Sequence, residues 1–308
     1  YSPFVSVTNT ALDVKARDLD LSIAPGAYVH LLPNIAGFVG SDHVAMLLAT
    51  KTLWTAGPQL AIDIGTNTEV SLIVDNKITC VSCASGPAFE GSHIKDGMPA
   101  ASGAIERLRI ENNQVEYETI NDSPPLGLCG SGILDAVAQL YLNGIIHKNG
   151  RMQDNHPRVH TDKKQREFVL LNKEERNGKP PIVITQQDIR QIQLAKSAIQ
   201  TGIQVLLKTS KIVADDLEKV IIAGAFGNYI DVANAITIGM LPLLPLKLFQ
   251  QVGNAAGMGA KLALVSSSKR DEAQDIRSQV RYIELSTAPN FSEIFIQANR
   301  IGTTNANE

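Results

Sequence analysis

The chain has 308 residues, of which 44% are hydrophobic, and its formal net charge is −3 at pH 7. This composition supports one large or two moderate domains and excludes the basic surface typical of nucleic-acid-binding proteins. No segment reaches the roughly 18 uninterrupted apolar residues of a membrane span, and three cysteines are too few for a disulfide framework. We therefore expect a cytoplasmic protein with no nucleic-acid or membrane partner.

The first predicted elements are a strand and a helix joined by a glycine-rich turn. The strand covers residues 27–32, and the helix covers residues 43–50 with Ser41 as its N-cap. A strand that runs through a glycine turn into a helix start is typical of α/β proteins.

Residues 60–85 predict an apolar strand, a glycine–threonine turn and two further strands. Gly65 lets the backbone approach an anion, and the N–H groups of residues 66–68 can point at one oxyanion. Asp63, at the end of the first strand, can hold a metal ion or orient a water molecule. The alternative for Asp63 is an ordinary turn aspartate. Cys80 and Cys83 follow on a strand, where side chains three residues apart point to opposite faces, so we expect packed cysteines.

The middle of the chain predicts a hairpin and a helix. Residues 105–110 and 115–120 pair across Asn112-Asn113. The sequence CGSG then opens a helix that ends at Leu142, and Ser131 is its predicted N-cap.

Residues 147–184 are charged and polar, which predicts a solvated insertion with one hairpin. Thr185 and Asp188 resemble a capping box ahead of a long amphipathic helix. The later predicted elements are a short helix at 215–219, a strand at 220–223, helices that begin at 232 and near 254, a strand at 280–285 and a helix at 292–299.

The strands at 27–32 and 220–223 each end in a glycine turn that is followed by a helix start, and the strand before Gly65 ends in a glycine turn as well. Unpaired N–H groups at a helix N-terminus favour an anion, and ligands of open α/β sheets lie at the carboxyl ends of strands. Several converging turns would hold a polyphosphate. The P-loop sequence GxxxxGK[ST] is absent, which excludes a P-loop NTPase.

The motifs in chain order resemble a known family. They are NIAGFVGSDHVAMLLA, IDIGTNTE, GPAFEG, GAI, LCGSGILD, TQQDIRQIQLAKSAI, AGAFGNYID and VGNAAGMGA. Together they are similar to the carboxyl-terminal ATPase domain of the reductive activators of corrinoid proteins. This domain is part of the superfamily that contains sugar kinases, actin and heat-shock chaperones. The resemblance implies an α/β, actin-like or ribonuclease-H-like ATPase fold, with a mixed sheet flanked by helices.

The resemblance also implies an activity. Such activators act on a corrinoid methyl carrier whose cobalt has been oxidised from Co(I) to Co(II). They use ATP and Mg²⁺ to drive one electron from an iron–sulfur cluster to that cobalt. The implied partner is a corrinoid protein, and a homodimer is a family-level expectation.

Site residues follow from matching motifs. Asp63 is the expected metal ligand, and Asp63, Glu69 and Glu90 are the expected catalytic residues, although the two glutamates could also be plain surface carboxylates. The expected nucleotide contacts are Gly65, Thr66, Asn67, Thr68, Gly130, Ser131, Gly224, Gly227, Asn228, Gly253 and Asn254.

Two parts of the family pattern are missing. The four cysteines of the cluster domain are absent, and only one DxGxT hairpin is visible where the superfamily has two. We expect residues 1–308 to be the carboxyl-terminal ATPase-type domain, with the insertion at about 147–184, of a longer protein that carries the cluster domain and the first lobe. The isolated chain is then poorly active. The alternatives are a small-molecule kinase of the same fold and a non-catalytic binding or oligomerisation module.

Overall fold

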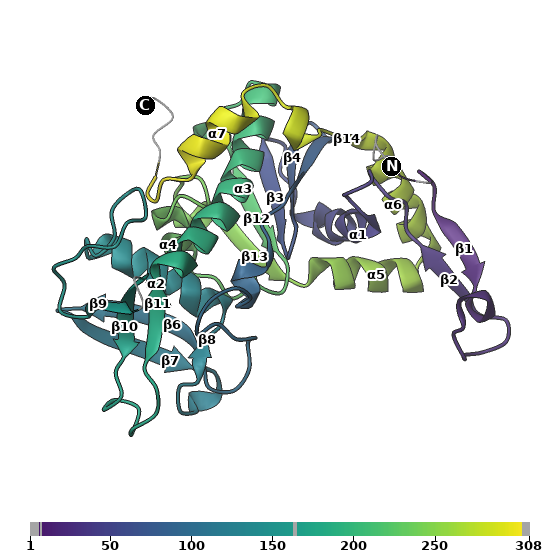
Figure 1. Ribbon diagram of the computed structural model, residues 1–308. Coiled ribbons are helices and arrows are strands. Elements are labelled where there is room, and N and C mark those ends of the chain that lie inside the picture. The colour runs from purple at the N-terminus through teal and green to yellow at the C-terminus, as the bar shows by residue number, and fades with distance from the viewer. Residues whose placement is uncertain (1–5, 7, 163–164, 304–308) are drawn as a thin grey trace.

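The computed structural model describes residues 6, 8–162 and 165–303. Its centre is a six-stranded mixed sheet of order β13-β12-β3-β4-β5-β14 (Figure 1). The strands are β3 (Gln59–Ile64), β4 (Thr68–Val74), β5 (Lys77–Cys83), β12 (Lys219–Ala223), β13 (Phe249–Gly253) and β14 (Val280–Tyr282). β3, β4 and β5 form an antiparallel meander, while β12 runs parallel to β3 and β13, and β14 runs parallel to β5. The predicted strand pairing within residues 60–85 is confirmed.

Helices cover both faces of this sheet. The long helix α3 (Gln186–Ser210) packs on β4 and β5, and α1 (Ser41–Thr50) covers the other face together with α5 (Ala255–Val265) and α6 (Ser267–Gln279). Successive side chains of a strand point to opposite faces of the sheet, so residues of one strand pack under different helices. Cys83 is buried in the cluster beneath α3 and Cys80 in the cluster beneath α1, so the prediction of packed cysteines on opposite faces is confirmed.

A second lobe carries two three-stranded sheets. One has the order β7-β6-β8 and the other β11-β10-β9. Their elements are β6 (Ala104–Glu111), β7 (Gln114–Thr119), β8 (Gly127–Leu128), β9 (Val159–Asp162), β10 (Gln165–Leu171) and β11 (Ile182–Thr185), with α2 (Gly130–Leu142) packed on β6. The hairpin across Asn112-Asn113 is confirmed. The expectation of a solvated insertion is wrong for part of this segment, because Phe168 and Leu170 of β10 are buried in the main core.

The remaining elements are a two-stranded sheet, a helix that packs on α2 and a helix that packs on α3. They are β1 (Leu12–Lys15), β2 (Tyr28–Leu31), α4 (Val232–Thr237) and α7 (Phe291–Ala298), with short 3₁₀ helices at Ala16–Leu19, Lys51–Leu53, Pro87–Glu90, Ile120–Asp122, Ala214–Asp216, Leu246–Leu248 and Leu285–Thr287. Within the described residues, none of the helices combines the length and apolar character needed to cross a bilayer.

The predicted helix starts are partly confirmed. Thr185 forms the capping box of α3 with Asp188, as predicted. The N-cap predictions for Ser41 and Ser131 are wrong, because each serine already lies inside its helix. The predicted short helix at 215–219 is also wrong: a 3₁₀ turn ends at Asp216, and Lys219 already belongs to β12, because pairing with β3 extends that strand backwards.

Candidate functional site

Three carboxylates gather at the carboxyl end of β3, and we call Asp42, Asp63 and Glu69 the carboxylate site. Asp63 is the fifth residue of β3 and lies on the sheet face that α1 covers. Glu69 of β4 is its direct partner across the antiparallel pair. Residues opposite each other in such a pair have neighbouring side chains. The strand register therefore brings the two carboxyl groups together.

The surroundings of this pair disfavour its ionised form. Burial, assisted by the charge of Asp42 at the start of α1, raises the pKa of Asp63 to about 6. Burial also raises the pKa of Glu69 to about 7, and the charges of Asp42 and Asp63 act in the same direction. The hydroxyl of Ser82 donates to Oε1 of Glu69 over 3.1 Å, which partly offsets these effects. No lysine or arginine of the described residues forms an ion pair with Asp63 or Glu69.

A buried histidine lies beside the carboxylate site. His43 of α1 is 1% exposed, and its Nε2 lies 2.7 Å from the hydroxyl of Ser71 on β4. Burial lowers the pKa of His43 to about 3, so its ring is neutral at pH 7. Its Nδ1 has no hydrogen-bond partner in the part of the chain that the structure describes. Ser71 shares a strand face with Glu69, so this hydrogen bond fixes α1 against the strand that carries the site.

The predicted phosphate turn is exposed next to Asp63. Gly65, Thr66 and Asn67 face solvent, whereas Thr68 is buried and its hydroxyl pairs with that of Ser85 at 2.9 Å. The N–H of Gly65 donates to the carbonyl of Asn67 over 3.2 Å, which closes the turn. The turn is therefore closed by its own hydrogen bond, and its backbone at residues 65–67 is accessible to solvent.

Glu90 is the third predicted catalytic residue, and the structure brings it to the phosphate turn. It is exposed at the end of the short 3₁₀ helix Pro87–Glu90 and accepts a hydrogen bond from the hydroxyl of Thr66. The loop after β5 is thereby tied to the turn after β3.

The glycine turn after β12 lies directly against Asp63. Gly224 has φ +96°, and a Cβ there would lie 2.3 Å from the carbonyl oxygen of Ile64 and 3.0 Å from Oδ1 of Asp63. Only glycine fits this close approach in a left-handed conformation. Its N–H donates to the carbonyl of Gly253 over 3.0 Å, which joins the turn after β12 to the one after β13.

Other predicted nucleotide contacts surround the same turns. The exposed side chain of Asn228 approaches Gly253, with its Cγ 3.8 Å from the position of a Cβ on that glycine. Asn254 caps α5 by accepting the N–H of Gly257 over 2.8 Å. Gly227 is buried, and its carbonyl accepts from Nε2 of Gln251. Four of the predicted segments thus lie together at the carboxyl ends of the strands.

Gly130 and Ser131, at the start of α2, are both buried. A Cβ on Gly130 would lie 1.8 Å from the carbonyl oxygen of Phe89 and 2.7 Å from the ring of Phe226. Those two rings stack with centroids 4.9 Å apart, which links the loop after β5 to the turn after β12. The start of α2 therefore supports the two turns from beneath, in a position away from solvent.

The donor set is consistent with a nucleotide and a magnesium ion. Magnesium is usually held by one or two carboxylates together with substrate phosphates and water, and Asp63 and Glu69 supply two carboxylates. No group of three or more His, Cys, Asp or Glu side chains in residues 6, 8–162 and 165–303 could hold a metal alone. The exposed turn around Thr66 supplies backbone N–H groups for an anion.

Sequence reasoning missed Asp42, His43, Ser71 and Ser82. The available signal for the two serines was strand alternation, since Ser71 lies two residues after Glu69 on one face. Asp42 and His43 had no local signal, because only the packing of α1 brings them to the sheet.

Comparisons with known protein families agree with this geometry. Residues 57–308 match the family model described as the C-terminal domain of RACo, the ASKHA domain. Residues 1–53 match a separate model, the RACo middle region. The match covers most of the chain and confirms the predicted actin-like ATPase fold.

Individual relatives are similar over nearly the whole chain. The corrinoid activation enzyme RamQ of Eubacterium limosum is 38% identical over 98% of this chain and 52% of the relative. The [Co(II) methylated amine-specific corrinoid protein] reductase of Methanosarcina barkeri is 28% identical over 86% of this chain and 50% of the relative. A solved reductive activator for corrinoid,iron-sulfur protein superposes with a TM-score of 0.90 at 36% identity, covering 99% of this chain and 49% of that one. The chain thus spans about half the length of the curated relatives it matches.

Proposed function

The chain belongs to the family of RACo C-terminal domains, the ASKHA domain, and we propose that it is the nucleotide-binding portion of an ATP-dependent reductive activator. The substrate of the complete protein is a corrinoid protein, which it returns from Co(II) to Co(I). The names of two homologues support this partner, since one is a corrinoid activation enzyme and the other a corrinoid protein reductase.

One observation carries the nucleotide-binding part of the proposal. The glycine turn after β12 lies so close to β3 that a Cβ on Gly224 would overlap Ile64 and touch Asp63. Two glycine turns and a carboxylate therefore meet at the carboxyl end of neighbouring parallel strands, where α/β proteins bind ligands.

Each element of the site has a role in this proposal. Asp63 and Glu69 hold the cation, and the backbone of residues 65–67 receives phosphate oxygens. Asn228 and Asn254, which flank the turns after β12 and β13, contact the nucleoside. Glu90, held by the Thr66 hydroxyl, orients the attacking water. When bound, Mg²⁺ neutralises phosphate charge during phosphoryl transfer, which is mostly a matter of positioning and charge stabilisation.

We further propose that residues 1–308 supply one wall of the nucleotide site. The sequence has one DxGxT hairpin, at Asp63, and the chain covers about half of its relatives. The second wall and the iron–sulfur cluster then belong to the other half of the longer protein. A chain with half of the clamp should bind Mg-ATP weakly and turn it over slowly.

The proposal is tested by replacing Asp63 with asparagine in the longer protein. Asp63→Asn keeps the shape but removes the charge that holds the cation, so corrinoid-stimulated ATP hydrolysis should fall by about 100-fold or more. The matched control is Asp275→Asn, an exposed aspartate of α6. Near-normal hydrolysis in Asp63→Asn would remove Asp63 from the mechanism.

The one-wall proposal has its own measurement. Isothermal titration of the 308-residue chain with Mg-ATP should give an affinity weaker than micromolar. Micromolar binding with steady turnover would show that the chain holds a complete site.

A further inference from the structure

A hollow of the molecule lies away from the carboxylate site. This cavity of about 470 Å³ is lined by Thr161, Gln165, Arg166, Gln186, Gln187 and Arg190. The lining residues come from β9, β10 and the first turns of α3, and none belongs to the carboxylate site or the glycine turns. We propose that this cavity is a binding site for a small molecule that carries phosphate or carboxylate groups, and we call it the arginine cavity.

The lining chemistry determines the ligand class. Every lining side chain has a hydrogen-bond donor, and none is a carboxylate. Arginine is the side chain best suited to bind planar or tetrahedral oxyanions through paired N–H groups. The volume lies within the range of small-molecule sites, which is roughly 300 to 1,000 Å³. A small organic oxyanion therefore fits both the donors and the space.

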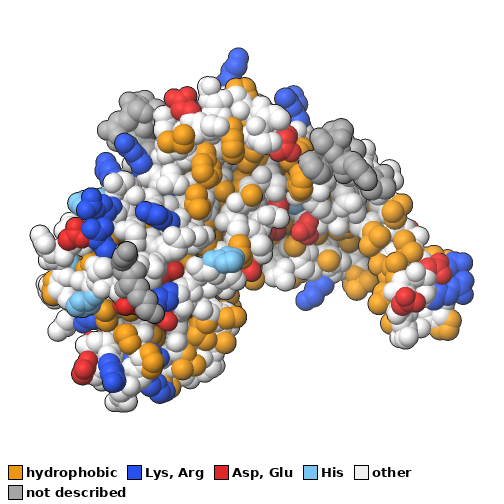
Figure 2. All heavy atoms as spheres, viewed as in Figure 1, with side chains coloured by type: hydrophobic (Ala, Val, Ile, Leu, Met, Phe, Trp, Pro, Cys, Tyr) orange, Lys and Arg blue, Asp and Glu red, His pale blue; other side chains and the backbone are white. Residues whose placement is uncertain are grey.

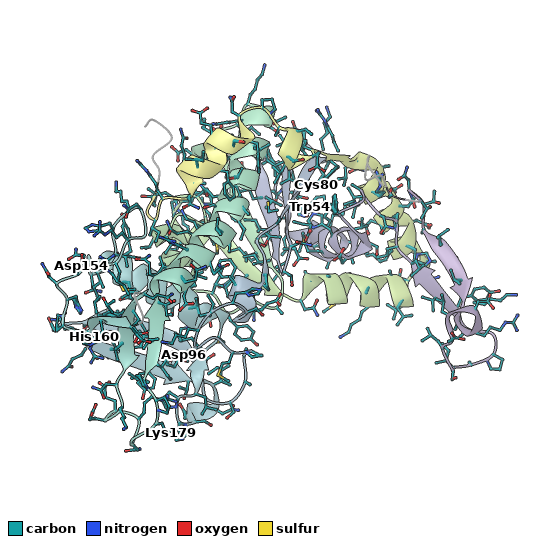
Figure 3. The ribbon with its side chains drawn as sticks, in the orientation of Figure 1. Trp54, Cys80, Asp96, Asp154, His160 and Lys179 are labelled. Carbon is teal, nitrogen blue, oxygen red and sulfur yellow. The ribbon has the colours of Figure 1, made fainter. Side chains whose placement is uncertain are left out.

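The side chains that line the arginine cavity carry two positive charges, Arg166 and Arg190, and no negative one. Nε of Arg166 donates to Oδ1 of Asp154, and Oδ2 of the same carboxylate lies 3.4 Å from Nη2 of Arg151. The single carboxylate of Asp154 thus interacts with both Arg151 and Arg166. Arg190, which is exposed on α3, forms no ion pair with any residue that the structure describes. Figure 2 shows basic side chains gathered on this lobe, around the place where Figure 3 labels Asp154.

The floor of the cavity is held in place before any ligand binds. Gln186 donates from Nε2 to the carbonyl of Gly150 over 2.7 Å and accepts at Oε1 from the N–H of Met152 over 2.9 Å. The start of α3 adds partial positive charge beside it. The nearest acid of this helix, Asp188, is buried and accepts the N–H groups of Thr185 and Lys95. Its carboxylate is therefore occupied by backbone groups.

Titration of the 308-residue chain with pyrophosphate and with citrate, without magnesium, tests the proposal. Removing one charge-assisted hydrogen bond should weaken binding roughly tenfold, so Arg190→Gln and Arg166→Gln should each have that effect. Arg109→Gln is the matched control, because Arg109 is an exposed arginine of β6 paired with Glu111 at 3.3 Å. Circular dichroism and melting temperatures establish that each variant is folded. Arg190→Gln keeps the test valid if loss of the Arg166–Asp154 pair disturbs the fold.

The two probes separate the sources of the oxyanion. Tighter binding of pyrophosphate assigns a phosphorylated ligand, and tighter binding of citrate assigns a polycarboxylate. Absence of binding at millimolar concentration of both probes would overturn the proposal. Binding that is equal in the wild type, Arg166→Gln and Arg190→Gln would overturn it as well.

Discussion

Replacing Glu69 by glutamine should stabilise the protein at pH 8 much more than at pH 5. Burial raises the pKa of Glu69 from 4.5 to about 7. Below pH 4.5 the carboxyl group is protonated in both the folded and the unfolded chain. Between pH 4.5 and 7 the unfolded chain releases the proton first, so the folded protein loses stability as the pH rises.

The expected magnitude follows from this pKa change. Each pH unit over which only the folded state keeps the proton costs about 1.4 kcal/mol, which gives about 3 kcal/mol above pH 7. Glu69 is partly exposed, and solvent screening reduces this to about 2 kcal/mol. Glutamine carries no charge and can still accept the hydroxyl of Ser82, so Glu69→Gln should escape the penalty.

Urea unfolding at pH 5, 6, 7 and 8 measures the free energy of unfolding for both proteins. The difference between Glu69→Gln and the wild type should grow by about 2 kcal/mol across this range. Glu111→Gln, on the exposed end of β6, is the control and should track the wild type at every pH. A difference that stays constant from pH 5 to 8 would refute the reasoning, because it would mean that Glu69 ionises as readily in the folded protein as in the unfolded chain.

Three further changes test other parts of the structure by urea unfolding. Thr185→Ala removes the acceptor that holds the N–H of Asp188 at 3.1 Å and should lower the unfolding free energy by about 1 kcal/mol; an unchanged midpoint would contradict the capping box. Gly224→Ala forces a Cβ to within 2.3 Å of the carbonyl oxygen of Ile64, so it should destabilise the fold by more than about 1 kcal/mol. Stability equal to the wild type would mean that the turn is open there. Burial lowers the pKa of Lys196 to about 7, so the folded protein releases that proton first, and wild-type stability should rise between pH 7 and 9.5. Lys196→Met should lack this rise, and a rise of equal size in the variant would assign it to another group.

The central meander was predictable because its pattern is local. Residues 59–83 alternate between two buried faces, and Asp75-Asn76 form the turn between β4 and β5 with positive φ. β13 was missed, since Phe249-Gln-Gln-Val offers no clear alternation and its pairing with β12 is entirely tertiary. α6 was missed for a related reason: only Ala273 and Ile276 of its 13 residues are buried, which gives a weak apolar periodicity.

The candidate site was predictable where glycine or a motif marked the backbone. Asp63 and Gly224 belong to such motifs, and the structure places them in contact range. The N-cap prediction for Ser131 failed because Cys129 already has the extended backbone of an N-cap, so the helix starts earlier than the hydroxyl suggested. Asp42 could not be predicted, since its effect on the carboxylate site depends on how α1 docks on the sheet.

The energetics of the carboxylate site support the proposal that it binds a cation. Asp63 and Glu69 are opposite each other, Asp42 adds a third acid, and no lysine or arginine of the described residues forms an ion pair with Asp63 or Glu69. Ionising both acids in this setting opposes folding, and a sequence selected for stability alone would replace one of them with a neutral residue. A divalent cation would reverse the sign of the effect, because the same two charges would then attract it. The destabilising pair of Asp63 and Glu69 therefore supports the proposed cation site.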